Sequence, residues 1–134
     1  MMYQMGVYCR LSKDDGENKV SESIENQMKL IREYVTKSED LEIADIYIDD
    51  GYSGLYFANR PEFQRMLKDI RDGKDGVSYV LVFKLSRFGR NVADVLNSLQ
   101  VMQDFGVNLV CVEDGIDSSK DAGKLMISVL SAVA

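Results

Sequence analysis

The sequence predicts an α/β fold with three layers, in which a mostly parallel sheet of four to five strands has helices on both faces. The first observation is a regular alternation along the chain between short apolar runs and longer amphipathic segments. Such alternation is typical of strand-helix-strand units, whose crossovers make neighbouring strands parallel. The second observation is size: 134 residues, of which 46% are hydrophobic, suit one buried core and leave no room for a second domain.

Four apolar runs are expected to be strands, because each is short and rich in β-branched, aromatic and aliphatic residues. A central strand in a sheet covered on both faces should be apolar on both sides. The four runs cover residues 3–9, 43–48, 78–83 and 107–112.

Three segments between these runs are predicted to be amphipathic helices, because their apolar residues recur at intervals of three and four. The first can begin at an N-cap serine, either Ser21 or Ser23. The second has Pro61 in its first turn and Gly73 after its last, and Gly106 follows the third. Their apolar faces comprise Ile24, Met28, Ile31 and Val35, then Phe63, Met66, Leu67 and Ile70, and then Val92, Val95, Leu96, Leu99 and Met102.

A fourth helix is predicted to begin near Lys120, after a turn at residues 114–115, with Ser118 or Ser119 as its N-cap. Its apolar residues cover more than one face, which is more than a helix on a single sheet needs. We therefore expect it to pack against a partner chain as well as its own domain. Burial within its own monomer is the alternative.

The sequence stops at Ala134 in the middle of this apolar pattern. We therefore expect the chain to be part of a longer protein. Residues 1–118 would form the compact domain, and residues 119–134 the first part of a long helix.

Residue counts exclude several kinds of chemistry. The absence of histidine excludes a Ser-His-Asp triad and a Cys-His pair. Cys9 and Cys111 are too few to build a structural zinc site, and their apolar surroundings indicate buried thiols in a reducing compartment rather than a disulfide. Asp14 and Asp15 are interpreted as solvated loop acids, so neither a metal nor a cofactor is expected.

Charge and hydropathy bear on partners and location. The net charge of −6 argues against a free-standing nucleic-acid binder, because such proteins owe their affinity largely to neutralised phosphates. No apolar run approaches the ~20 residues of a membrane span, and no signal-like stretch is present. A cytoplasmic protein without a membrane partner is expected.

The first strand carries polar residues that a covered sheet does not need. Period two places Tyr8, Arg10 and Ser12 on one side of it. Arginine binds phosphate through a planar fork that keeps its charge, so the pattern favours a nucleophilic serine beside a cation that holds an anionic substrate. An ordinary salt bridge for Arg10 and simple packing for Tyr8 are the alternatives.

Two further clusters follow strands. Lys84, Arg87 and Arg90 place three cations at a strand-to-helix junction, and residues 49–54 with Arg60 follow the second strand. In a parallel sheet these groups meet at the carboxyl edge, where ligands bind. Several arginines around one serine, without histidine, suggest phosphoryl transfer through a covalent serine intermediate.

Together these motifs resemble the serine recombinases (resolvases and invertases) over nearly the whole chain. The segment 8–12, Tyr-Cys-Arg-Leu-Ser, looks like the family's Y-x-R-x-S, whose serine attacks a DNA phosphodiester and becomes linked to the 5′ phosphate. Gln27 matches the glutamine near the start of the first helix. Residues 50–54 with Arg60 are similar to the family's D-x-x-S-G…R, and residues 84–90 resemble K-L-D-R-L-x-R.

The resemblance implies a site-specific DNA recombinase that cleaves and rejoins DNA without ATP, through a 5′-phosphoserine on Ser12. Arg10, Arg87 and Arg90 would hold the phosphate oxygens, and Asp50 would orient an arginine. The other candidates would line the site or position the phosphate or the serine. The candidate site residues are Ser12, Arg10, Arg87, Arg90, Asp50, Arg60, Gln27, Ser53, Tyr8 and Lys84.

The resemblance also implies partners: DNA, and self-association into a dimer and a synaptic tetramer through the helix from about Ser119. Ser86 replaces the aspartate of small resolvases, and the loop 13–19 is longer than theirs. That loop resembles the large serine recombinases of transposons and integrative elements, whose DNA-binding domains follow the catalytic domain. Such an arrangement would explain an acidic catalytic domain.

Two other classes of protein share some of these sequence features. A phospho-receiver signalling module would share the acidic charge and an Asp14-Asp15 pair, but it needs an aspartate at the end of its third strand, where Phe83 and Lys84 stand. A low-molecular-weight phosphatase using Cys9 would need arginine at position 15. Metal distinguishes the receiver, which requires Mg²⁺, from the serine mechanism, which should proceed in EDTA.

Overall fold

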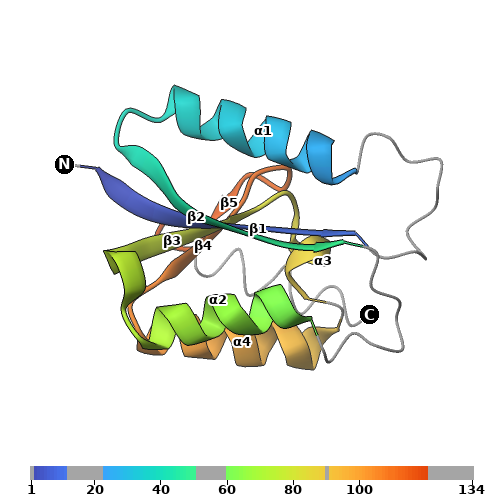
Figure 1. The fold of residues 1–134 in the computed structure, drawn as a ribbon, viewed down its shortest axis with the longest axis vertical. Helices are drawn as coiled ribbons and strands as arrows, with labels where there is room; N and C mark the ends of the chain where they lie inside the picture. Colours follow the sequence, from blue (N-terminus) through green and yellow to red (C-terminus); the bar gives the residue numbers. More distant parts are fainter. Residues whose placement is uncertain (1, 12–22, 51–59, 90, 121–134) are drawn as a thin grey trace.

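A computed structural model describes residues 2–11, 23–50, 60–89 and 91–120 of the chain (Figure 1). The described helices and strands alternate as the sequence predicts. In chain order they are β1 (Tyr3–Leu11), α1 (Ile24–Lys37), β2 (Leu41–Asp50), α2 (Pro61–Arg71), the 3₁₀ turn η4 (Lys74–Gly76), β3 (Val77–Val82), α3 (Leu85–Phe88), α4 (Val92–Asp104), β4 (Asn108–Cys111) and β5 (Ile116–Asp117).

The sheet has five strands in the order β2-β1-β3-β4-β5. β1 pairs in parallel with β2 and β3, β3 pairs in parallel with β4, and β5 alone pairs antiparallel with its neighbour. The predicted mostly parallel sheet is therefore confirmed. Since β1, β2 and β3 run in the same direction, the polar residues at their carboxyl ends lie along one edge.

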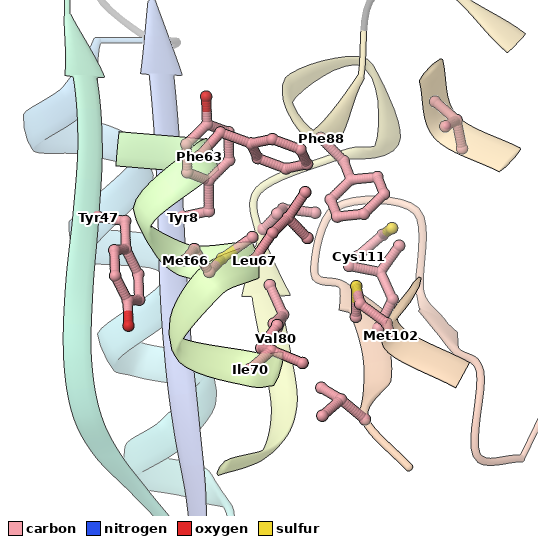
Figure 2. Packing of buried hydrophobic residues seen from close by; sticks show 14 of the residues in the cluster. Tyr8, Tyr47, Phe63, Met66, Leu67, Ile70, Val80, Phe88, Met102 and Cys111 are labelled. Atoms are coloured by element: carbon pink, nitrogen blue, oxygen red, sulfur yellow. The ribbon is translucent and has the colours of Figure 1, made fainter. Parts of the chain in front are cut away.

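Helices cover both faces of this sheet, which confirms the three layers. α1 lies on one face, and α2 and α4 lie side by side on the other (Figure 1). The face under α1 buries one apolar cluster that includes Val7, Cys9 and Ile31. The opposite face buries a larger one, in which side chains of α2 such as Phe63 and Met66 pack on the sheet (Figure 2).

The helix ends follow local signals in the sequence. Ser23, rather than Ser21, is the N-cap of α1, and its hydroxyl accepts a hydrogen bond from the Asn26 amide at 3.1 Å. Gly73 after α2 and Gly106 after α4 have φ of 68° and 72°, a conformation that glycine adopts without steric cost. These three signals were all readable from the sequence.

Three short elements, η4, α3 and β5, were not predicted. α3 contains four residues and β5 two, so neither is long enough to show a period. The fourth helix predicted near Lys120, and its cap at Ser118 or Ser119, depend on residues 121–134, which lie outside the described residues. Within the described part of the chain, no helix is long and apolar enough to cross a membrane.

Both cysteines are buried free thiols, as predicted. Cys9 lies in β1 and Cys111 in β4, on opposite faces of the sheet. Burial raises the pKa of each thiol to about 12, from an ordinary value of 9.0. The folded state therefore holds these protons more tightly than the unfolded chain does.

This difference makes the fold sensitive to alkali. Stability from a raised pKa is fully present below the unfolded value and is lost as pH rises toward the folded one. Between about pH 8 and about pH 10 we expect each thiol to lower the free energy of unfolding by roughly 1 kcal/mol. Urea denaturation at the two pH values measures this, and a Cys9→Ala, Cys111→Ala variant should show a smaller fall. An equal fall in the variant would contradict the assignment.

Candidate active site

The predicted site residues that the structure describes gather where β1, β2 and β3 end. Five of them, Tyr8, Arg10, Gln27, Arg60 and Arg87, are almost completely buried. Their contacts join β1, α1, α2 and α3 into one connected arrangement. Three further candidates, Ser12, Ser53 and Arg90, lie outside the described residues.

Arg10 ties the end of β1 to α3. Its Nε donates to the carbonyl of Arg87 at 3.4 Å, and its Nη2 donates to the carbonyl of Ser86. These carbonyl partners fix the guanidinium without neutralising its charge.

Gln27 holds the backbone of the same residue from α1. Its Nε2 donates to the carbonyl of Arg10 at 3.0 Å, and its Oε1 accepts from the amide of Arg10 at 3.4 Å. The backbone N–H and C=O of Arg10 are thus both bound by one buried amide side chain. The chain is fixed two residues before Ser12.

Arg60, the residue just before α2, reaches across to α3 and α4. Its Nη1 donates to the carbonyl of Phe88 at 2.8 Å, and its Nη2 forms an ion pair with Asp94 at 2.7 Å. The guanidinium also lies 3.9 Å from the centre of the Phe63 ring, a cation–π contact. These contacts make Arg60 a brace between three helices.

Arg87 lies on the short helix that these two arginines hold. Its side chain is buried, and Phe88 beside it packs edge-on against Phe63 with ring centres 5.4 Å apart. Lys84, which precedes α3, is half-buried, and its ammonium lies 5.8 Å from the Phe83 ring centre. Of the predicted phosphate-binding arginines, the structure therefore brings Arg10 and Arg87 into direct contact.

Tyr8 does more than pack. Its hydroxyl donates to Asp49 Oδ2 at 2.8 Å, and its ring meets the edge of Phe63 with centres 5.0 Å apart (Figure 2). Burial raises the pKa of this phenol well above its ordinary value, and Asp49 raises it further, against the lowering effect of Arg60. The tyrosine therefore stays protonated and remains a donor.

Asp49 is a residue that the sequence reasoning missed. It is fully buried and accepts three hydrogen bonds, from Tyr8 and from the backbone amides of Glu62 and Phe63 at 3.1 Å each. It thereby caps the first turn of α2. The predicted Asp50 is exposed at the end of β2. Period two from the buried Tyr47 would have identified Asp49 as the inward-facing member of the pair.

The described residues contain no group of three or more cysteine, aspartate or glutamate side chains placed to hold a metal ion. What the edge offers is the buried guanidinium groups of Arg10, Arg60 and Arg87, close to the end of the strand that leads to Ser12. Fixed cations of this kind stabilise charge on a transferring phosphoryl group. The fold and this edge together define an α/β domain with buried cations at the carboxyl edge of its sheet.

Comparisons with known proteins identify the family. Residues 5–134 match the Resolvase, N terminal domain. The chain is 30% identical over 134 residues to the serine recombinase PinQ of Escherichia coli K12, covering 99% of this chain and 62% of that protein. It is 30% identical over 112 residues to the DNA-invertase hin of Salmonella typhimurium LT2, covering 84% of this chain and 54% of the invertase.

Two solved structures share the fold. A resolvase family site-specific recombinase from Streptococcus pneumoniae is 51% identical, with a TM-score of 0.76, over 98% of this chain and 85% of that one. The N-terminal catalytic domain of TP901-1 integrase is 29% identical, with a TM-score of 0.78, over 97% of this chain and 93% of that one. The chain therefore belongs to the resolvase family of serine recombinases, which confirms the resemblance of its motifs. It spans 62% of the length of PinQ.

The contact between Tyr8 and Asp49 gives a stability prediction. Tyr8→Phe removes the phenol that donates to a fully buried carboxylate, and a buried acceptor that loses a partner costs about 1–3 kcal/mol. We expect a loss of that size in urea denaturation. Tyr79→Phe is the matched control, since its hydroxyl makes an exposed contact of 3.5 Å with Ser119. Equal effects of the two substitutions would contradict the role given to Asp49.

A second prediction concerns the backbone between α3 and α4. A Cβ at Gly89 would lie 2.5 Å from Val95 Cγ2 and 2.9 Å from Asp94 Oδ2, the partner of Arg60. Gly89→Ala should therefore destabilise the protein by about 1–3 kcal/mol through overpacking. In Gly6→Ala the added atom meets its nearest neighbour, Tyr47, at 3.5 Å, so this control should change the urea midpoint little. A midpoint for Gly89→Ala as high as that of the control would refute the prediction.

Proposed function

We propose that this chain is the catalytic domain of a site-specific DNA recombinase, which cleaves and rejoins DNA through a 5′-phosphoserine on Ser12. The observation that carries the proposal is the locked contact between Arg10 and Arg87 at the sheet edge, two residues before that serine. Membership of the resolvase family supports the same reaction.

In the proposed reaction the Oγ of Ser12 attacks a backbone phosphorus. The bond between phosphorus and the 3′ oxygen breaks as the new bond forms, and the proton lost by the serine is matched by the one gained by the 3′ hydroxyl. Arg10, Arg87 and Arg90 hold the non-bridging oxygens and stabilise the charge of the transition state. Removal of one such donor typically costs about 10²–10³ in rate.

The other candidates have supporting roles in this proposal. Gln27 and Arg60 position the serine and the arginines, as their buried contacts with Arg10 and Phe88 suggest. Ser53 positions the phosphate, and Asp50 orients an arginine, since a carboxylate facing phosphate would be repelled. The ester linkage preserves the energy of the phosphodiester, so religation to an exchanged strand needs no ATP and no cofactor.

The proposed partners are DNA and further copies of the chain. Residues 1–118 would form the catalytic domain, and residues 119–134 would begin a helix through which dimers and a synaptic tetramer assemble. DNA sites would be read mainly by a region beyond this chain, and the protein would act in the bacterial cytoplasm. The relatives PinQ, of which the chain spans 62%, and the Tn2501 resolvase, both of Escherichia coli, support this organisation.

A phosphoacceptor receiver is the disfavoured alternative. β3 ends at Val82 and leads into Phe83 and Lys84, so no aspartate stands at the position that a receiver phosphorylates. The family match and the recombinase relatives point away from signalling as well.

The deciding experiment traps the covalent intermediate. The full-length protein is incubated in EDTA with sheared genomic DNA of its source organism. Adducts are then recovered under denaturing conditions. We expect a nucleotide-linked peptide that mass spectrometry assigns to Ser12, with DNA of one recurrent sequence attached through its 5′ phosphate.

The matched controls are two serine substitutions. Ser12→Ala should abolish the adduct, because no other hydroxyl would lie at the reacting position. Ser78→Ala, near the amino end of β3, should leave it unchanged. An adduct that persists in Ser12→Ala, or one that needs Mg²⁺, would disprove the serine mechanism.

A further inference from the structure

Asp114, in the turn between β4 and β5, contacts α3, the helix that carries Arg87. Its Oδ2 accepts a hydrogen bond from the backbone amide of Leu85, the first residue of α3, at 2.8 Å. The pair is separated by 29 residues in the sequence. This aspartate was not among the candidate site residues.

α3 needs such outside contacts. A helix of four residues is far below the length at which a helix is stable by itself, so its place depends on what holds it. Arg10 and Arg60 bind carbonyls at its carboxyl end, as described above. Lys84, at the N-cap position, has no acceptor atom and makes no cap hydrogen bond with its side chain. Asp114 takes the place of that missing cap.

The turn that carries Asp114 is itself firmly placed. The Glu113 amide donates to the Phe83 carbonyl at 2.7 Å, which extends the pairing of β3 with β4. Gly115 has φ of 65°, a turn conformation that glycine adopts without steric cost, and the next residue, Ile116, is buried. The backbone of this turn therefore holds the Asp114 carboxylate next to the Leu85 amide.

We propose that Asp114 is a positioning residue for the cleavage reaction, which acts by holding α3 so that Arg87 meets the phosphate. The inference rests on the proposed function. In this proposal the β4–β5 turn is part of the site. It holds the amino end of α3, whereas Arg10 holds the carboxyl end. Asp114 itself does not contact the substrate in this proposal.

The test compares variants of neighbouring carboxylates. Asp114→Ala removes the acceptor, Asp114→Asn keeps an oxygen for the Leu85 amide, and Glu113→Ala removes an equal charge from the exposed neighbour. The substrate is the DNA recovered from the trapped adduct. We expect single-turnover adduct formation about tenfold slower in Asp114→Ala, with binding of that DNA within about twofold of the parent. Asp114→Asn and Glu113→Ala should stay within about threefold.

Two measurements separate positioning from a general loss of structure. Amide hydrogen exchange at Leu85 should be at least about tenfold faster in Asp114→Ala and unchanged in Glu113→Ala. In an Arg87→Lys background, Asp114→Ala should cost less than it does in the parent, since it acts through Arg87. Fully additive losses would overturn the inference.

Failure of this inference differs from failure of the proposed function. If the parent forms the Ser12 adduct and Asp114→Ala forms it equally fast, Asp114 has no positioning role. If the parent forms no adduct on its recovered or genomic DNA, the recombinase reaction itself is wrong, and the role of Asp114 in it falls as well.

Discussion

The hydrogen bonds from Arg10 and Arg60 to the carbonyls of α3 are the constraint on which the site depends. A buried guanidinium is costly unless its N–H groups find acceptors, and α3 supplies those acceptors as backbone carbonyls. The same bonds give a four-residue helix the support that it cannot provide for itself. The same contacts therefore bury Arg10 and Arg60 and place Arg87. They join β1 and the start of α2 to α3.

Helix capping separates the elements near the site from the others. α1 and α4 carry their own caps, Ser23 and Asn91, within the first turn. α2 and α3 are preceded by Arg60 and Lys84, whose side chains have no acceptor atom. They are capped instead by Asp49 from the end of β2 and by Asp114 from the β4–β5 turn. α2 and α3 are thus capped by residues of distant segments rather than by their own neighbours in the sequence. Such anchoring gives the arginines the rigidity that charge stabilisation requires.

Charged side chains near the site are also arranged differently from those elsewhere in the domain. The whole chain carries a net charge of −6, yet the buried cations in the described part of the chain, Arg10, Arg60 and Arg87, lie together at one edge of the sheet. Acidic side chains on the outside pair with cations of their own, as Asp45 does with Arg65 and Lys74. Buried positive charge is therefore concentrated at this edge, although the chain as a whole is acidic. This fits a catalytic domain that is brought to DNA by another part of its protein, as we propose.

The sequence by itself determined the fold class, the strand and helix order, and the edge at which the site would lie. Periodicity and local caps such as Ser23 and Gly73 are short-range properties, so they can be read from neighbouring residues. The motif around Arg10 and the cluster around Arg87 were also visible, because residue type and position after a strand are enough to indicate phosphate chemistry.

Tertiary structure alone decided how these residues act on one another. Arg10 and Arg87 are 77 residues apart, and Tyr8 and Asp49 are 41 apart, so no local pattern connects them. The sequence pointed to Asp50, but the pleat of β2 turns that residue outward and Asp49 inward. Asp114 looked like part of a turn, and only the pairing of β3 with β4 brings it to α3. Hydrogen bonds between distant segments are set by sheet order and register, which emerge only when the whole chain packs.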